Sequence, residues 1–149
     1  MFSGTGANTS GNPFADNGAV PDGDDVIGLQ QAITISQLLS GLTIGQQYRL
    51  TLEYNSRTGD APFALITIDG NTAFNAAVPE VSGVNAYYHL DYDFIATATT
   101  TTLAIANQGL LADSTLLVDN VRVGAVPSQV PSRRCSAAAA YCSPGVGVG

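Results

Sequence analysis

The residue types that carry most enzyme chemistry are scarce in this chain. It has one histidine, His89, no lysine, and two cysteines, Cys135 and Cys142, close to its C-terminal end. A reactive nucleophile needs a neighbouring base, and a zinc site needs several Cys or His ligands, so these residues supply neither. The sequence also lacks the G-x-S-x-G, H-E-x-x-H and P-loop motifs. We therefore expect a protein that is not an enzyme; whether the two cysteines pair is left open.

The closest approach to catalytic chemistry is a group of three carboxylates on two expected strands. Asp91 and Asp93 share one strand face, and Glu53 stands on a strand that we expect nearby. A glycosidase needs two carboxyl groups held at a fixed separation. Cleft enzymes usually bring such groups from different loops. We therefore favour a solvent-exposed face on which Arg49 and His89 pair with the acids, and hydrolysis is the alternative.

A mixed set of polar and aromatic side chains suits sugar binding better than catalysis. Sugar sites place an aromatic platform beside amide, carboxylate and guanidinium groups. The outward phase of the expected strands 47–55 and 87–97, with the residue just beyond the first, supplies these types. The candidate ligand-binding residues are Tyr87, His89, Asp91, Arg49, Glu53, Asn55 and Arg57. The alternative is an ordinary solvent-exposed face, which the absence of tryptophan favours.

Acidic residues at two places suggest a calcium ion, which binds carboxylate and carbonyl oxygens. Asp22 and Asp24 stand in one Asp-rich turn. Asp119 falls on the same alternation phase as Leu117 and Val121, and we interpret this phase as facing inward. A carboxylate among core residues needs a partner or an ion. We take Asp119, Asp22 and Asp24 as candidate calcium ligands, and a hydrogen-bonded structural aspartate as the alternative.

The strands that carry these residues follow from the alternation of apolar and polar side chains. Strict alternation in 47–55 is typical of an antiparallel strand with one buried face. Short strands at intervals of roughly ten residues, with turn signals such as Asp69-Gly70 between them, predict an all-β, two-sheet antiparallel sandwich. The expected strands are 26–30, 32–38, 47–55, 63–69, 72–78, 87–97, 99–107 and 115–123.

The composition is that of one weakly charged, acidic domain. We expect an irregular N-terminal segment, 1–25, packed on a sandwich domain, 26–123, followed by a tail or linker, 124–149. Charged residues make up 11% of the chain and the net charge is −7. Nucleic acids and anionic lipids need clustered Lys and Arg, so we expect neither as a partner. No apolar run is long enough for a membrane span, and no signal peptide stands at the start.

Short stretches along most of the chain occur in the order seen in a known family. The stretches are 13–23, 35–37 with 39–42, 45–48 with 54–57, 68–70, and 113–121. They resemble carbohydrate-binding-module-like jelly-roll domains of the galactose-binding-like type, found in secreted bacterial proteins with a PEP-CTERM-style tail. The resemblance implies a non-catalytic, secreted or cell-surface module whose partner is a glycan or exopolysaccharide. In related modules a structural calcium uses the first Asp of the last strand's motif, which matches Asp119.

Two departures from this family bear on function. Its first strand, with an Asn-Gly-Ser-Phe-Glu-like motif, and a later tryptophan are missing, so we expect a chain that begins partway into the fold. An open sheet edge would then remain near the N-terminus, and open edges pair with other strands. Self-association through that edge, as a structural or matrix subunit, is the alternative function. Val126-Pro127 is also not followed by the apolar helix of the family's tail.

Overall fold

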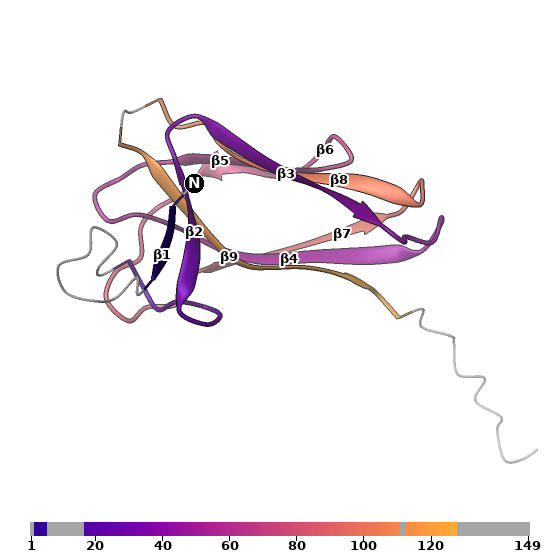
Figure 1. The fold of residues 1–149 in the computed structure, drawn as a ribbon, viewed down its shortest axis with the longest axis horizontal. Helices are drawn as coiled ribbons and strands as arrows, with labels where there is room; N and C mark the ends of the chain where they lie inside the picture. Colours follow the sequence, from indigo (N-terminus) through magenta and orange to yellow (C-terminus); the bar gives the residue numbers. More distant parts are fainter. Residues whose placement is uncertain (1, 6–16, 111–112, 128–149) are drawn as a thin grey trace, which may run out of the picture.

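The computed structural model describes residues 2–5, 17–110 and 113–127, and these form two antiparallel sheets stacked face to face (Figure 1). No helix occurs in these ranges. The strands are β1 (Phe2–Thr5), β2 (Asp25–Gln30), β3 (Ile33–Ser40), β4 (Gln47–Ser56), β5 (Phe63–Ile68), β6 (Asn71–Ala77), β7 (Tyr88–Ile95), β8 (Thr100–Asn107) and β9 (Thr115–Ala125). All eight strands expected from the alternation pattern are confirmed within a few residues at each end.

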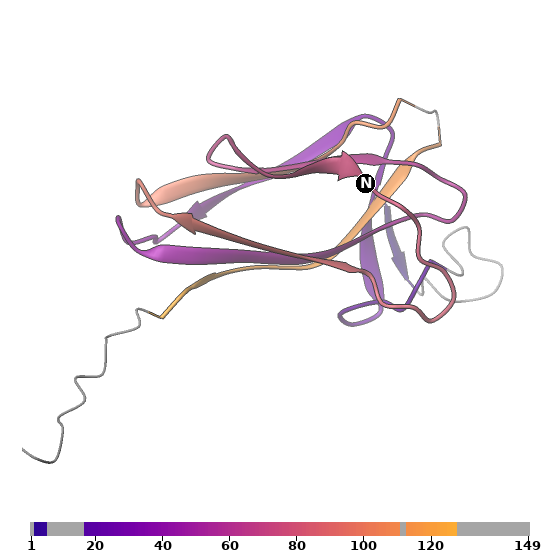
Figure 2. The same ribbon diagram turned by 180° about the vertical axis from the view of Figure 1, so that it is seen from behind.

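The strand order is that of a jelly roll. The five-stranded sheet has the order β1-β2-β9-β4-β7, and the four-stranded sheet has the order β3-β8-β5-β6. Strands from the two halves of the chain therefore interleave in both sheets, and Figure 2 shows the same two layers from behind. With β1 as an additional edge strand, β2 to β9 make the eight strands of the double Greek key. The predicted two-sheet sandwich is confirmed.

The core lies between the sheets and contains the inward half of each alternating strand. In β4, Leu50 and Leu52 are fully buried, whereas Arg49, whose side chain lies on the opposite face of the strand, is exposed. This alternation is what a sheet with one buried face requires. The buried core residues are Leu29, Leu50, Leu52, Ala64, Ile66, Val78, Leu103, Ile105, Leu116 and Val118.

The β5–β6 connection is the tight hairpin that the sequence predicts. Asp69 and Gly70 have φ values of 51° and 76°. Two successive left-handed residues are the conformation that a two-residue hairpin turn needs, because it matches the twist of the flanking strands. The amide of Asp69 also donates to the carbonyl oxygen of Thr102, at 2.9 Å, which ties the turn to β8.

The ends of the chain differ from the predictions in two ways. The sequence predicts an irregular segment 1–25 and an open edge, but β1 pairs antiparallel with β2 along all four of its residues and occupies that edge. β9 runs to Ala125, two residues into the predicted tail. Residues 128–149, with Cys135 and Cys142, lie outside the described residues. Within the described part, no helix could cross a membrane.

A bulge in β9 reverses the phase of that strand. The pairing of β9 with β4 shifts in register between Thr51 and Glu53, and Asn120 opposite the shift has a φ of 50°. One extra residue of this kind moves the following side chains to the other face. Val123 therefore packs on the core, and Asp119 lies on the outer face. The prediction that Asp119 faces inward is wrong for this reason.

Candidate functional site

The outer face of the five-stranded sheet brings together four of the predicted ligand-binding residues. The register of β4 against β7 places Arg49 opposite Asp93, Thr51 opposite Asp91, and Glu53 opposite His89. Directly opposite residues of an antiparallel pair have their side chains on the same face. The acidic and basic groups therefore form one charged surface on β4 and β7.

The arginine on this surface is already paired. Arg49 donates from Nε to Asp93 Oδ1 at 2.6 Å and from Nη2 to Asp93 Oδ2 at 2.8 Å. These hydrogen bonds raise the pKa of Arg49 and lower the pKa of Asp93. A bidentate pair of this kind occupies the Nε–Nη2 edge of the guanidinium. A ligand at this position would have to use the remaining N–H donors of Arg49 or displace Asp93.

His89 is held between two carboxylates. Its Nδ1 lies 3.1 Å from Glu53 Oε1, and its Nε2 lies 3.3 Å from Asp91 Oδ2. The hydrogen bond with Glu53 is the main cause of a raised pKa for His89, and the contact with Asp91 adds to it. His89 is half-exposed, so the arrangement is a surface ion-pair cluster in which the imidazole bridges two strands.

The titration of His89 gives a direct test of this cluster. We expect its midpoint, followed by the single imidazole's NMR signals, to lie above the ordinary value of 6.5. Because the folded-state pKa is raised, the charged imidazole stabilises the fold below pH 6.5, and this contribution is lost as the pH rises through the folded-state value. Glu53→Gln should return the midpoint toward 6.5, and Asp91→Asn should lower it by less. A wild-type midpoint at 6.5 would contradict the geometry.

Tyr87, the predicted aromatic platform, is buried. It packs with Val26 and Leu117 on the outer face of the five-stranded sheet, where Val20 and Val81 cover it. This small second core makes Tyr87 only 7% exposed. Burial, followed by the charge of Asp119, raises the pKa of Tyr87 to about 12. The prediction of an exposed aromatic platform is therefore wrong, because the segments around Val20 and Val81 cover this end of the sheet.

Asn55 is buried by the same covering segments. Its Nδ2 donates to the carbonyl oxygens of Asn17, at 2.6 Å, and Val81, at 3.0 Å, and its Oδ1 accepts from the Val81 amide at 2.8 Å. The amide group is thus fully used in attaching two segments to the sheet. Asn55 therefore has a structural role here, and both amide donors of its buried side chain are used within the protein.

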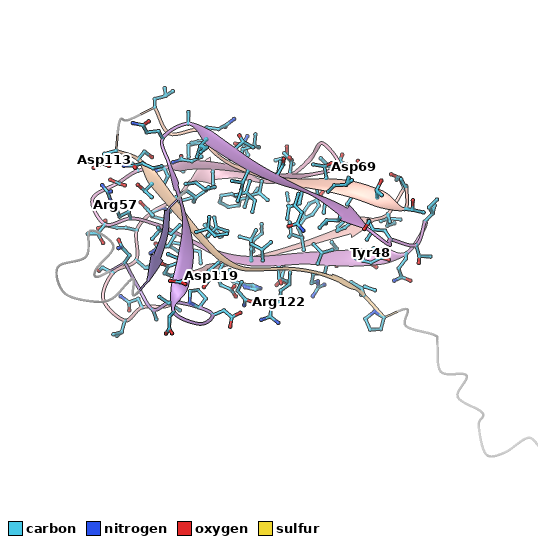
Figure 3. The ribbon with its side chains drawn as sticks, viewed as in Figure 1. Tyr48, Arg57, Asp69, Asp113, Asp119 and Arg122 are labelled. Atoms are coloured by element: carbon cyan, nitrogen blue, oxygen red, sulfur yellow. The ribbon has the colours of Figure 1, made fainter. Side chains whose placement is uncertain are left out.

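Arg57 stands apart from the charged surface, at one end of the sandwich. It pairs with Asp60 at 3.3 Å and with Asp113 at 2.6 Å. Figure 3 shows Arg57 and Asp113 together at this end. Asp60 in turn accepts a hydrogen bond from the amide of Thr115, at 2.9 Å. Arg57 therefore connects the loops that contain Asp60 and Asp113, close to the start of β9. It does not contribute to the charged surface around Arg49.

The predicted calcium ligands are used as hydrogen-bond acceptors or lie in solvent. Asp119 accepts from the amide of Asp22, at 3.0 Å, and from the amide of Asn120, at 2.7 Å. The Asp22 carboxylate is 3.5 Å from the guanidinium of Arg122, and Asp24 is exposed. In the described part of the chain, no three His, Cys, Asp or Glu residues are arranged to hold a metal. Calcium binding by Asp119, Asp22 and Asp24 stays a prediction.

The four-stranded sheet has the opposite character. Its strands β3, β5, β6 and β8 contain no charged residue, although the chain as a whole carries a net charge of −7. Threonine, serine and alanine dominate the outer face, and the larger apolar side chains Leu38 and Phe63 are exposed on it. Sheet faces in contact with water normally carry charges, so this neutral surface needs an explanation.

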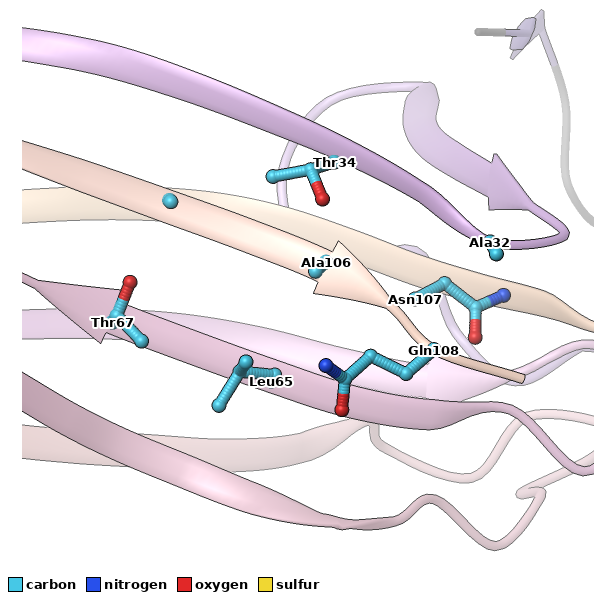
Figure 4. A pocket seen from close by; sticks show the side chains of 8 residues that line it. Ala32, Thr34, Leu65, Thr67, Ala106, Asn107 and Gln108 are labelled. Atoms are coloured by element: carbon cyan, nitrogen blue, oxygen red, sulfur yellow. The ribbon is translucent and has the colours of Figure 1, made fainter. Parts of the chain in front are cut away.

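A shallow groove runs over this neutral face along β8. Ala104 and Ala106 form its floor, because β8 lies between β3 and β5 and these alanines point outward. The register places Thr34 and Leu65 on either side of Ala106. The groove has a volume of about 320 Å³, and Figure 4 shows the side chains around it. Its lining residues are Ala32, Thr34, Leu65, Thr67, Ala104, Ala106, Asn107 and Gln108.

The sequence alone did not lead to a prediction of this groove, although one sequence feature points to it. The strand 99–107 has alanines on its outward phase, and the expected strands 32–38 and 63–69 contain a single charged residue, Asp69, at the end of the second. Small residues flanked by taller ones produce a channel, but the flanking residues are known only once the strand order is known. The groove offers threonine hydroxyls, one exposed glutamine amide and apolar surface, and it contains no titratable side chain.

Comparison with known proteins bears on the fold. No protein-family model and no curated protein sequence matches the chain. Among solved structures, the C-terminal domain of EclA, described as a sugar-binding protein, matches with 19% identity and a TM-score of 0.53 over 78% of this chain and 90% of that one. The insecticidal delta-endotoxin Cry8Ea1 from Bacillus thuringiensis matches with 16% identity and a TM-score of 0.51, over 70% of this chain and 20% of the toxin.

A third solved structure is the enzymatically active domain of tailspike protein 4 of bacteriophage CBA120. It matches with 13% identity and a TM-score of 0.50, over 75% of this chain and 17% of that chain. This chain thus corresponds to about a fifth of the toxin and of the tailspike domain, and to nearly all of the EclA domain. At these identities the likeness is one of fold, and the chain shares a β-sandwich fold with these domains.

Proposed function

We propose that this chain is a non-catalytic, secreted or cell-surface glycan-binding module, and that the glycan lies in the alanine-floored groove over β8. The observation that carries the proposal is a concave, uncharged surface lined by hydroxyl, amide and apolar groups. A largely apolar groove with a few polar groups is the usual form of a small-molecule site. The similarity in fold to a sugar-binding domain supports it.

The chemistry of the groove favours a neutral glycan. Sugar hydroxyls can exchange hydrogen bonds with Thr34, Thr67 and Gln108, and the C–H faces of a sugar ring can contact Leu65 and the alanine floor. The net charge of −7 opposes the approach of an anionic polymer. The charged surface around Arg49 is a weaker candidate, because its arginine is already bound to Asp93.

Filling the groove tests this proposal. Ala104→Leu adds a side chain that points outward from the floor, so it should exclude the ligand without disturbing the core. We expect affinity for a neutral polysaccharide to fall at least about tenfold, which corresponds to about 1.4 kcal/mol. The measurement is affinity gel electrophoresis with soluble β-glucan, galactan and mannan, and the wild type should be retarded by at least one of them.

Thr102→Leu is the matched control, because Thr102 is exposed on the same strand but does not line the groove. Its retardation should equal that of the wild type. Arg49→Ala separates the two surfaces of the sandwich. If Arg49→Ala abolishes binding while Ala104→Leu leaves it unchanged, the ligand lies on the charged surface and the assignment to the groove is wrong.

A further inference from the structure

β3 is an edge strand without the features that normally prevent an edge strand from pairing with another chain. It pairs with β8 along all eight residues of Ile33–Ser40 with no register shift. In the described part of the chain, its other side pairs with no strand. It contains no charge and no proline. Natural proteins protect long edges with charged residues, proline or bulges, because a free edge is a template for another strand.

The other edges of the sandwich are protected. β1 is four residues long. β7 presents His89, Asp91 and Asp93 on its outer face. β6 is uncharged, but its pairing with β5 shifts in register between Ile66 and Thr67, and a bulge of this kind twists an edge away from regular pairing. Among the described strands, β3 alone combines length, regularity and neutrality at an edge.

An apolar opening lies beside this edge, between the two sheets. It has a volume of about 270 Å³, and the bulge at Asn120 leaves Val121 beside it 37% exposed. On the outer face of β3, Leu38 is 65% exposed. The lining residues are Ile27, Ile35, Ser36, Gln37, Leu103, Ile105 and Val121. A strand added next to β3 would remove apolar surface from water on both sides of the sheet.

We propose that β3 pairs antiparallel with β3 of a second copy of this chain. Each copy carries a net charge of −7, so two copies repel one another unless they meet through a neutral surface. β3, at the edge of the uncharged four-stranded sheet, offers such a surface. An antiparallel pair related by a two-fold axis brings the same strand from both copies together, which is the geometry of an isologous dimer.

The residue pattern of β3 fits one register of this dimer, centred on Gln37. Ile35, which packs on the core, then faces the partner's Leu39, also a core-facing position. On the outer side, Thr34 faces the partner's Ser40. On the same outer side Ser36 faces the partner's Leu38, and on the inner side Gln37 faces the partner's Gln37 between the two apolar Ile35–Leu39 pairs. The two four-stranded sheets become one sheet of eight strands, with both grooves on the same side.

Molecular mass in solution tests the dimer. The chain has a mass of 15.3 kDa, and light scattering or sedimentation of the full chain should show the mean mass rising toward twice this value with concentration. Leu38→Lys places a charge on the exposed edge and should weaken dimerisation at least tenfold. Asn75→Lys places the same charge on β6 and should leave it unchanged. Circular dichroism verifies that both variants are folded. A wild type that keeps the single-chain mass, or equal weakening by both variants, overturns the proposal.

Cross-linking tests the register independently. In a Cys135→Ser, Cys142→Ser background, Gln37→Cys should form a dimer under mild oxidation, because directly opposite residues have Cα atoms roughly 4.5–5.5 Å apart, within the range of a disulfide. Asn75→Cys is the matched control and should remain monomeric under the same conditions. Equally rapid cross-linking of the two variants would show random collision and would overturn the pairing through β3.

Discussion

Replacement of Asn107 by alanine is expected to lower the free energy of unfolding by roughly 3 kcal/mol. Asn107 is fully buried at the end of β8. Its Nδ2 donates to the carbonyl oxygens of Leu29, at 2.9 Å, and Ser114, at 3.0 Å, and its Oδ1 accepts from the amide of Gly109 at 2.9 Å. The side chain thus connects the four-stranded sheet to β2, in the other sheet, and to the loop before β9.

The expected loss comes from the partners that alanine would leave behind. The buried Gly109 amide would lose its partner, and the carbonyls of Leu29 and Ser114 would each lose one hydrogen bond, although Ser114 keeps the one from the Gln31 amide. A buried group left without a hydrogen bond costs about 1–3 kcal/mol. Urea unfolding measures the effect. Asn75→Ala, on the exposed face of β6, is the control and should change stability by less than about 0.5 kcal/mol. Similar losses for both variants would mean that Asn107 does not join the sheets.

Replacement of Gly18 by alanine is expected to have an effect of similar size, about 3 kcal/mol, from a different cause. Gly18 has a φ of +89°, and a Cβ atom there would lie 2.9 Å from the carbonyl oxygen of Asn85 and 3.1 Å from the Tyr87 ring. The backbone oxygen cannot move freely, because it accepts a hydrogen bond from the amide of Ala19 at 2.8 Å. The substitution combines left-handed strain with overpacking.

Gly23→Ala separates these two contributions. Gly23 has a φ of +65°, but no atom lies within 4 Å of the position of its Cβ. Gly23→Ala should therefore lower the free energy of unfolding only through the strain of the left-handed conformation, by about 1–2 kcal/mol. Urea unfolding compares the two variants, and hydrogen exchange around residues 17–20 should increase in Gly18→Ala alone. Equal losses and equal exchange would show that the segment is not packed against Tyr87.

The sequence predicted best what depends on local alternation. The eight strands, the inward residues of β4 and the Asp69-Gly70 hairpin follow from side-chain periodicity and turn chemistry, and the structure confirms them. The proximity of Arg49, Glu53, His89 and Asp91 could be anticipated for the same reason, since they share one phase on two strands that pair.

The failures arise where the packing of loops, a local bulge or the strand order decides the outcome. Tyr87 and Asn55 have the outward phase, yet residues 17–26 and 79–86 fold over them. Leu117 also has the outward phase, and an apolar residue at that position could have indicated that this part of the outer face is buried. The bulge at Asn120 depends on a single backbone conformation, which periodicity does not reveal. The groove requires the strand order, because its floor and its walls come from strands that are not neighbours in sequence.

The position of β9 determines when this molecule can fold. Among the described strands β9 is the last to be synthesised, yet it lies between β2 and β4 and pairs with both. Until residue 125 has left the ribosome, the five-stranded sheet lacks its centre, and the growing chain presents two unpaired strand edges. Pairings between distant segments also form slowly, since each must close a long loop. We therefore expect the five-stranded sheet to fold only after β9 has been synthesised.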